Sequence, residues 1–157
     1  HGTHKKDVVF ELSSDHHKHT VSNDNYVLLK RFTSKDESKR LVSSLHMRKN
    51  CNSNYIGIGN KLNYVGLMNG SLDETEAFGL MAVFNSSFMD KYFRCISGNT
   101  QVNSTEVRVM MFPSRIQVKK IGEELIKLTG FDQTKIDNIV NLVAGLSNSK
   151  PFPNNIE

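Results

Sequence analysis

Residues 76–93 read EAFGLMAVFNSSFMDKYF, and this stretch decides the fold. Its apolar side chains recur at helical spacing but cover more than one face, which predicts one long helix buried on most sides. Just upstream, Ser71 and Glu74 fit a capping box, in which a hydroxyl and a carboxylate satisfy the free amides of a helix start. We therefore expect the helix to begin in residues 71–74 and to be capped at its end by Gly98.

Short apolar or alternating runs precede this helix. Residues 8–12, 26–33 and 41–47 contain β-branched and aromatic side chains and are predicted strands. Residues 55–68 carry apolar positions on both sides of Gly59-Asn60-Lys61, which predicts a hairpin turn between two further strands. Together these runs predict a small mixed or antiparallel sheet.

Two more helices are expected near the C-terminus. Residues 107–112 have the composition of a strand, and Ser114 and Gln117 then form a second possible capping box. The apolar periodicity that follows predicts one helix ended by Gly130 and a shorter one over residues 132–144. The sequence thus predicts an α+β fold, in which the small sheet accompanies a long buried helix and a C-terminal helical hairpin.

The length of 157 residues fits one domain. We expect that domain to span residues 7–146, with a flexible leader at residues 1–6 and a flexible tail at residues 147–157. No apolar run approaches the roughly 18 residues of a membrane span and no export leader is recognisable, which predicts a cytoplasmic protein. The first residue is His rather than Met, so we expect a fragment of a longer protein.

Positive charge is concentrated in residues 26–50, which we call the basic window. It holds seven Lys and Arg residues against two acidic residues, whereas the net charge of the whole chain is only +4. Such a concentration favours contact with a polyanion, and phosphate groups of nucleic acid are the expected partner. The alternative is a solvated, charged turn between two strands.

A second polar segment follows the long helix. Residues 97–108 read SGNTQVNSTEVR, and we call residues 97–103 the amide-rich run. Neutral amides can bond base edges, and an Asn or Gln side chain can bond adenine through two hydrogen bonds, whereas charges alone carry no sequence information. The alternative is a solvated polar loop.

Three blocks of the chain, residues 26–41, 55–64 and 76–103, resemble the C-terminal target-recognition region of bacterial N6-adenine DNA methyltransferases of restriction-modification systems. The resemblance spans roughly residues 20–130. It implies a bacterial, cytoplasmic protein that binds duplex DNA and selects the methylation site. The methyl group would come from S-adenosylmethionine, bound by a catalytic methyltransferase domain of the same parent chain.

The catalytic signatures of that family are not found in these 157 residues. The family uses an Asn/Asp-Pro-Pro-aromatic motif, but the prolines here are Pro113, Pro151 and Pro153, and no two are adjacent. A glycine-rich cofactor loop is missing as well. We therefore expect the chain to hold no cofactor and to be inactive alone, while its parent is a site-specific adenine methyltransferase.

The DNA contacts are expected from the basic window, the predicted turn at residues 60–61 and the amide-rich run. The predicted set is Lys30, Arg31, Ser34, Lys35, Lys39, Arg40, Asn60, Lys61, Asn99, Thr100, Gln101 and Asn103.

Metal chemistry is a weaker alternative. Glu37-Ser38-Lys39 resembles the Glu-x-Lys pattern of Mg²⁺-dependent restriction nucleases, with Asp24 as a second carboxylate. Such a site needs Glu and Lys on an apolar strand, and this stretch is strongly polar. Residues 15–19 read DHHKH, but adjacent histidines in a flexible stretch point apart, which favours a solvated loop over a zinc site.

Two other hypotheses remain. The C-terminal helical hairpin has the short turn of a helix-turn-helix, but residues 132–144 carry one basic residue, Lys135, where a recognition helix would meet DNA. A protein-interaction module with the same α+β core is the third class of function, and the basic window argues against it.

Overall fold

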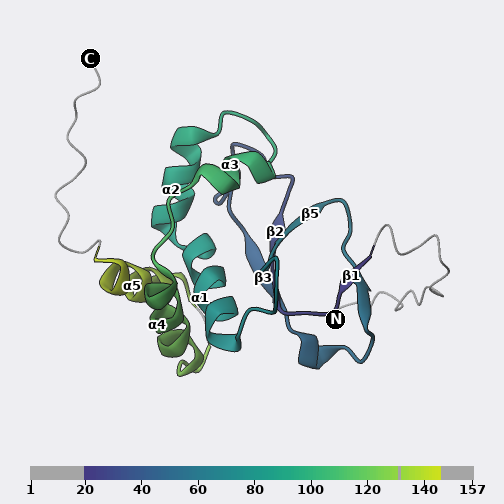
Figure 1. The fold of residues 1–157 in the computed structure, drawn as a ribbon. Coiled ribbons are helices and arrows are strands. Elements are labelled where there is room, and N and C mark those ends of the chain that lie inside the picture. The colour runs from purple at the N-terminus through teal and green to yellow at the C-terminus, as the bar shows by residue number, and fades with distance from the viewer. Residues whose placement is uncertain (1–19, 131, 146–157) are drawn as a thin grey trace, which may run out of the picture.

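The computed structural model describes residues 20–130 and 132–145. This part of the chain forms an α+β fold with short antiparallel strands on one side and helices on the other, as the sequence predicts (Figure 1). The strands are β1 (Thr20–Ser22), β2 (Tyr26–Lys30), β3 (Ser43–His46), β4 (Tyr55–Gly57) and β5 (Leu62–Val65). The helices are α1 (Glu74–Asn85), α2 (Ser87–Ile96), α3 (Ser104–Val109), α4 (Arg115–Ile126) and α5 (Gln133–Ala144), with a short 3-10 turn, η2 (Arg48–Asn50).

Strand β2 is the centre of the main sheet, whose order is β3-β2-β5. Val27 lies opposite Leu45 on one side and Val65 on the other. Val27 and Leu29 are buried and alternate with more exposed residues, as expected for a strand with one face on the core. The predicted strands 26–33 and 41–47 are therefore confirmed in shorter form.

The predicted hairpin over residues 55–68 is wrong. The turn exists, with the Leu62 amide donating to the Gly59 carbonyl at 3.0 Å. The strands on its two sides, however, enter different sheets: β4 pairs with β1, whereas β5 pairs with β2. A local turn reverses the chain but does not choose its pairing partner, because that choice depends on which apolar faces are buried together.

The predicted long helix is interrupted at Ser86. This residue has an extended backbone, with φ −70° and ψ 145°, and it separates α1 from α2. Its hydroxyl donates to the Val83 carbonyl at 2.7 Å and accepts from the Met89 amide at 3.2 Å. A serine side chain that bonds the backbone on both sides offers an alternative to the helical hydrogen bonds, and two helices result.

Both predicted ends of that helix are also corrected. The N-cap is Asp73 with Glu76 as its capping-box partner, rather than Ser71 with Glu74. At the other end α2 stops at Ile96, and Gly98 does not adopt the left-handed conformation of a glycine cap.

The predicted strand over residues 107–112 is wrong: residues 107–109 lie in α3, and residues 110–112 belong to no helix or strand. Asn103 is the N-cap of α3, and the Glu106 carboxylate accepts its backbone amide at 3.3 Å. Val107 and Met110 are buried while Val109 is exposed, which is helical rather than alternating spacing. The capping residues therefore override the β-branched composition of this stretch.

The helical hairpin is confirmed. Ser114 caps α4 with Gln117 as its partner, and Gly130 and Gly145 have positive φ values of 91° and 74° near the two helix ends. The hairpin packs on α1, where a Cβ added at Gly79 would lie 1.9 Å from the Val118 carbonyl oxygen of α4. Only glycine permits this approach.

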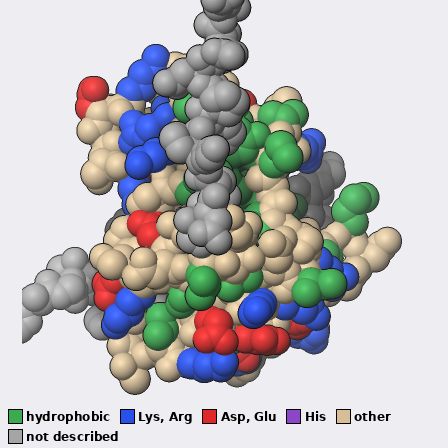
Figure 2. Space-filling model, turned by 90° about the vertical axis from the view of Figure 1, so that its left-hand side faces the viewer, with side chains coloured by type: hydrophobic (Ala, Val, Ile, Leu, Met, Phe, Trp, Pro, Cys, Tyr) green, Lys and Arg blue, Asp and Glu red, His purple; other side chains and the backbone are tan. Residues whose placement is uncertain are grey.

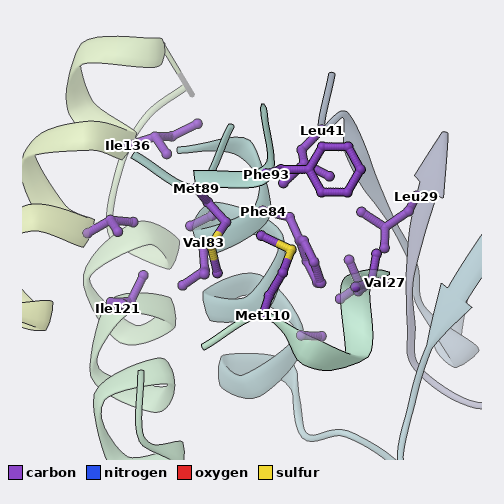
Figure 3. Packing of buried hydrophobic residues seen from close by; sticks show 14 of the residues in the cluster. Val27, Leu29, Leu41, Val83, Phe84, Met89, Phe93, Met110, Ile121 and Ile136 are labelled. Atoms are coloured by element: carbon purple, nitrogen blue, oxygen red, sulfur yellow. The ribbon is translucent and has the colours of Figure 1, made fainter. Parts of the chain in front are cut away.

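One continuous core joins the sheet to the helices. Figure 3 shows Val27 and Leu29 of β2 facing Phe84 of α1 and Phe93 of α2, with Ile121 of α4 and Ile136 of α5 continuing the apolar packing away from the sheet. The core thus fixes β2, α1 and α2 relative to one another.

Some predictions lie outside the described residues. These are the strand at residues 8–12, the histidine-rich segment at residues 15–19, the leader at residues 1–6 and the tail at residues 147–157. Within residues 20–130 and 132–145, no helix is long and apolar enough to cross a membrane.

Candidate nucleic-acid interface

The structure brings the amide-rich run against the basic window at the end of β2. Phe32 and Gln101 form an antiparallel bridge. The Val102 amide donates to the Arg31 carbonyl at 2.7 Å, and the Thr33 amide donates to the Thr100 carbonyl at 3.2 Å. Two segments that are far apart in the sequence therefore continue the antiparallel pairing beyond the sheet (Figure 1).

The turn before β5 also contacts the chain at the end of β2. The Arg31 amide donates to the Lys61 carbonyl at 3.0 Å, and the Arg31 guanidinium donates to the Asn60 carbonyl at 3.3 Å. From β5, the Asn63 side-chain amide donates to the Val102 carbonyl at 2.6 Å. All three predicted polar segments therefore meet around Arg31, and Asn63 is a contact that sequence reasoning missed.

Two lysines of the predicted set are free to bind a ligand. Lys35 and Lys61 are exposed, and neither forms an ion pair with another described residue. Lys30 is also exposed, but it donates to Glu37 at 2.7 Å. That bond, together with the Ser34 amide, lowers the pKa of Glu37, so the carboxylate stays charged and offsets Lys30.

Arg40 does not belong to the contact surface. Its side chain is 1% exposed, and its guanidinium donates to the Thr33 hydroxyl at 3.0 Å and to the Asn99 carbonyl. Arg40 is therefore left out of the contacts proposed below, because a side chain buried under two other segments does not reach a phosphate.

Lys39 is likewise directed inward. Its ammonium group donates to the Asn85 carbonyl at the end of α1 and to the Gln133 side chain of α5. Partial burial lowers the pKa of this lysine, although Asp137 and Asp90 act in the opposite direction. Lys39 therefore links the helices and is removed from the proposed contacts.

The four predicted DNA contacts in the amide-rich run divide into two kinds. Asn99 donates from its side chain to Glu106 at 3.1 Å, and Asn103 is the N-cap of α3, so both support the local structure. The side chains of Thr100 and Gln101, by contrast, have no hydrogen-bond partner among the described residues. Gln101 is therefore the amide that remains available to a base edge.

Ser34 has a local role. Its hydroxyl accepts from the Asp36 amide at 3.3 Å, and its own amide donates to the Glu37 carboxylate at 3.0 Å. These bonds shape the turn on which Lys35 lies. Arg94 of α2 holds the same turn through the carbonyls of Lys35 and Glu37, a role without any motif in the sequence.

The residues of the nuclease alternative are not assembled. Asp24 precedes β2 and accepts from the Ser22 hydroxyl at 2.8 Å, whereas Glu37 contacts Lys30 at the far end of that strand. Lys39 is engaged with α1 and α5. In the described ranges, no group of three or more His, Cys, Asp or Glu residues is arranged to hold a metal ion.

Lys135, on which the helix-turn-helix alternative depends, is engaged in an ion pair. Lys135 lies 3.4 Å from the Asp132 carboxylate, within the first turn of α5. Figure 2 shows the face on which α2, α4 and α5 lie: basic side chains gather in its upper part, whereas acidic and basic side chains lie together at the bottom. In and beside the helical hairpin, Arg115, Lys119, Lys127 and Lys135 each form an ion pair with a carboxylate.

Comparison with known proteins gives two similar sequences. The chain is 40% identical over 121 residues, 77% of its length, to the Type II methyltransferase M.PstI of Providencia stuartii. It is 38% identical over 117 residues, 74% of its length, to the Type II methyltransferase M.BsuBI of Bacillus subtilis. These matches cover 24% and 23% of the two relatives, so the chain spans about a quarter of their length. No family model and no solved structure matches. Most of this chain is thus related to part of the Type II methyltransferases.

Proposed function

We propose that this chain is the target-recognition region of a site-specific N6-adenine DNA methyltransferase of a bacterial restriction-modification system. It binds duplex DNA and selects the site, while a catalytic domain in the same polypeptide carries out the reaction. The observation that carries this proposal is that the segments bearing Lys35, Lys61 and Gln101 meet at the end of β2. The similarity to two Type II methyltransferases supports it.

The free lysines supply affinity. Each ammonium group that neutralises a phosphate releases a condensed counterion, so binding through Lys35 and Lys61 weakens as salt rises. Arg31 adds positive charge at the end of β2, although its guanidinium also bonds the Asn60 carbonyl. These contacts set the orientation of the domain on the duplex without reading its sequence.

Gln101 supplies the sequence information. Its side-chain amide has both a donor and an acceptor, which matches the N6 and N7 positions on the major-groove edge of adenine. The bridge to Phe32 and the bonds at Arg31 and Thr33 hold its backbone, so the side chain extends from a fixed backbone position.

The chemistry itself is assigned to the rest of the polypeptide. S-adenosylmethionine supplies the methyl group there, and the target adenine must leave the base stack to be reached. The residues described here hold the neighbouring duplex in register during that step.

The test is binding of a fluorescent DNA duplex to this chain and to the Lys35→Gln/Lys61→Gln variant across a salt series. We expect the parent to bind with Kd in the range of roughly 10⁻⁴ to 10⁻⁶ M at physiological salt. The variant should bind more weakly, and its slope of log Kd against log salt should fall by about two.

The control variant is Lys120→Gln/Lys127→Gln, which removes the same charge on and just after α4. It should leave Kd and slope nearly unchanged. If the two double variants behave alike, the contact surface is not where we propose it. Association that does not respond to salt would indicate a protein-interaction module instead.

A further inference from the structure

We infer that Arg40 is a positioning residue, which locks the amide-rich run onto the chain after β2 so that Gln101 and Lys35 keep a fixed spacing on DNA. The inference rests on the proposed function and adds to it a residue that does not touch the ligand. It assigns a role to the most buried charge of the predicted set.

The guanidinium of Arg40 joins two segments at once. Its Nε donates to the Thr33 hydroxyl at 3.0 Å, its Nη2 donates to the Asn99 carbonyl, and its carbon Cζ lies 5.4 Å from the centre of the Phe93 ring. Within the described part of the chain, no carboxylate forms an ion pair with it. A buried charge costs free energy unless its donors are satisfied, so these two acceptors and the ring hold the side chain in place.

The backbone of Arg40 is itself anchored to α2. Asp90 accepts the amides of Arg40 and Leu41 through one oxygen, at 2.6 and 2.8 Å, and the Nε of Arg94 through the other, at 2.8 Å. Burial by itself would raise the pKa of Asp90, but the bonds from Arg94 and the two amides lower it, so the carboxylate stays charged. A charged acceptor makes these bonds stronger than neutral ones.

Arg94 also holds the turn that carries Lys35. Its two Nη groups donate to the carbonyls of Lys35 at 2.9 Å and Glu37 at 2.7 Å. Helix α2 thus holds the Lys35 turn through Arg94 and the amide-rich run through Arg40, and both arginines are oriented by Asp90. The spacing between Lys35 and Gln101 is therefore set by α2, which belongs to the rigid core.

This arrangement has a consequence for binding. A surface held in its bound geometry does not lose conformational freedom when DNA arrives, so the same contacts give higher affinity. Loss of Arg40 should weaken binding while the number of phosphate contacts stays the same. A true phosphate contact would instead change the number of counterions released.

The first test is Arg40→Lys, which keeps the charge but loses the planar fork that reaches two acceptors. We expect the amides of Thr33 and Val102, which pair the two segments, to exchange hydrogen faster in the variant. Affinity for a DNA duplex should fall by roughly three- to tenfold, in line with the loss of one buried hydrogen bond. The salt slope should not change.

Two further variants make the result decisive. Thr33→Val removes the acceptor of the Arg40 Nε and keeps the shape, so it should also speed exchange at Val102, and it decides the matter if Arg40→Lys does not fold. Arg115→Lys changes an exposed arginine at the start of α4, outside the basic window, and should alter neither measurement.

The possible outcomes distinguish a failure of the Arg40 inference from a failure of the proposed function. A salt slope lowered by about one in Arg40→Lys would show that Arg40 touches phosphate and would overturn the inference. The inference would also be overturned if the Val102 amide exchanged hydrogen at the parental rate in folded Arg40→Lys. If Arg40→Lys does not fold, the same result in Thr33→Val would overturn it. If the Lys35→Gln/Lys61→Gln variant binds DNA normally, the proposed function fails instead, whatever the exchange rates are.

Discussion

Phe32 and Gln101 face each other in an antiparallel bridge at the end of β2. Residues directly opposite each other in such a pairing place their side chains on the same side, so Gln101 shares a face with the exposed Phe32. The Arg31 guanidinium carbon lies 5.6 Å from the centre of that ring. A single pairing therefore places an amide, an aromatic ring and a positive charge together on one surface.

In the full-length methyltransferase that we propose as the parent of this chain, replacing Gln101 by Ala should reduce discrimination between DNA sites. If Gln101 bonds a base, the loss should be about 1 to 3 kcal/mol on the cognate sequence and less on a sequence altered at the contacted base pair. The measurement is the ratio of methylation rates on the two duplexes. An unchanged ratio would mean that Gln101 is only part of a solvated loop.

Replacing Asn103 by Ala should act on stability instead. Asn103 is the N-cap of α3, and loss of such a residue costs about 1 kcal/mol. We expect a lower Tm in a circular dichroism melt. The ratio of methylation rates on cognate and altered duplexes should stay at the parental value. A shift in that ratio at normal Tm would show instead that Asn103 contacts a base.

Gly79→Ala should destabilise the protein, although alanine is normally the better helix former. A Cβ at this position would lie 1.9 Å from the Val118 carbonyl oxygen, so α1 and α4 would have to separate. We expect a loss of about 1 to 3 kcal/mol in the free energy of unfolding, measured with urea. Gly98→Ala is the control, because its Cβ would have no atom within 4 Å and its φ is not positive. Equal effects of the two variants would contradict the close packing of α1 on α4.

Asp73 should make stability depend on acid pH. Burial by itself would raise the pKa of Asp73, but hydrogen bonds from Lys119, Thr75 and the Glu76 amide hold it at about 2, below its ordinary value of 3.8. A lowered pKa gives stability that is complete above about pH 4 and is lost as the pH falls toward 2.

Asp73→Asn tests this effect, because asparagine also caps helices but carries no charge. The variant should be less stable than the parent at pH 7, and the difference should shrink between pH 4 and pH 2. Urea denaturation across that range measures it. A difference that is constant with pH would mean that the charge of Asp73 contributes nothing.

Several elements could be predicted from the sequence alone, because their causes lie within a few residues. The β2 strand follows from the apolar run of β-branched and aromatic side chains that begins at Tyr26, and the α4 start follows from the Ser114 hydroxyl and its partner Gln117. The turn near Gly130 and the end of α5 at Gly145 need positive φ, which glycine adopts at no steric cost. Composition also located the two polar segments, the positively charged basic window and the neutral amide-rich run.

Tertiary structure decided how those pieces are used. Nothing near Arg40 in the sequence shows that its charge is buried, because the groups that hold it come from Thr33, Asn99 and Phe93. The pairing of β5 with β2 and the bridge of Phe32 to Gln101 are likewise long-range contacts. Residue type determines which bonds a side chain can make, but the packing of distant segments determines which groups it meets. Here that packing buries Arg40 in a structural role and leaves Lys35, Lys61 and Gln101 free to bind a ligand.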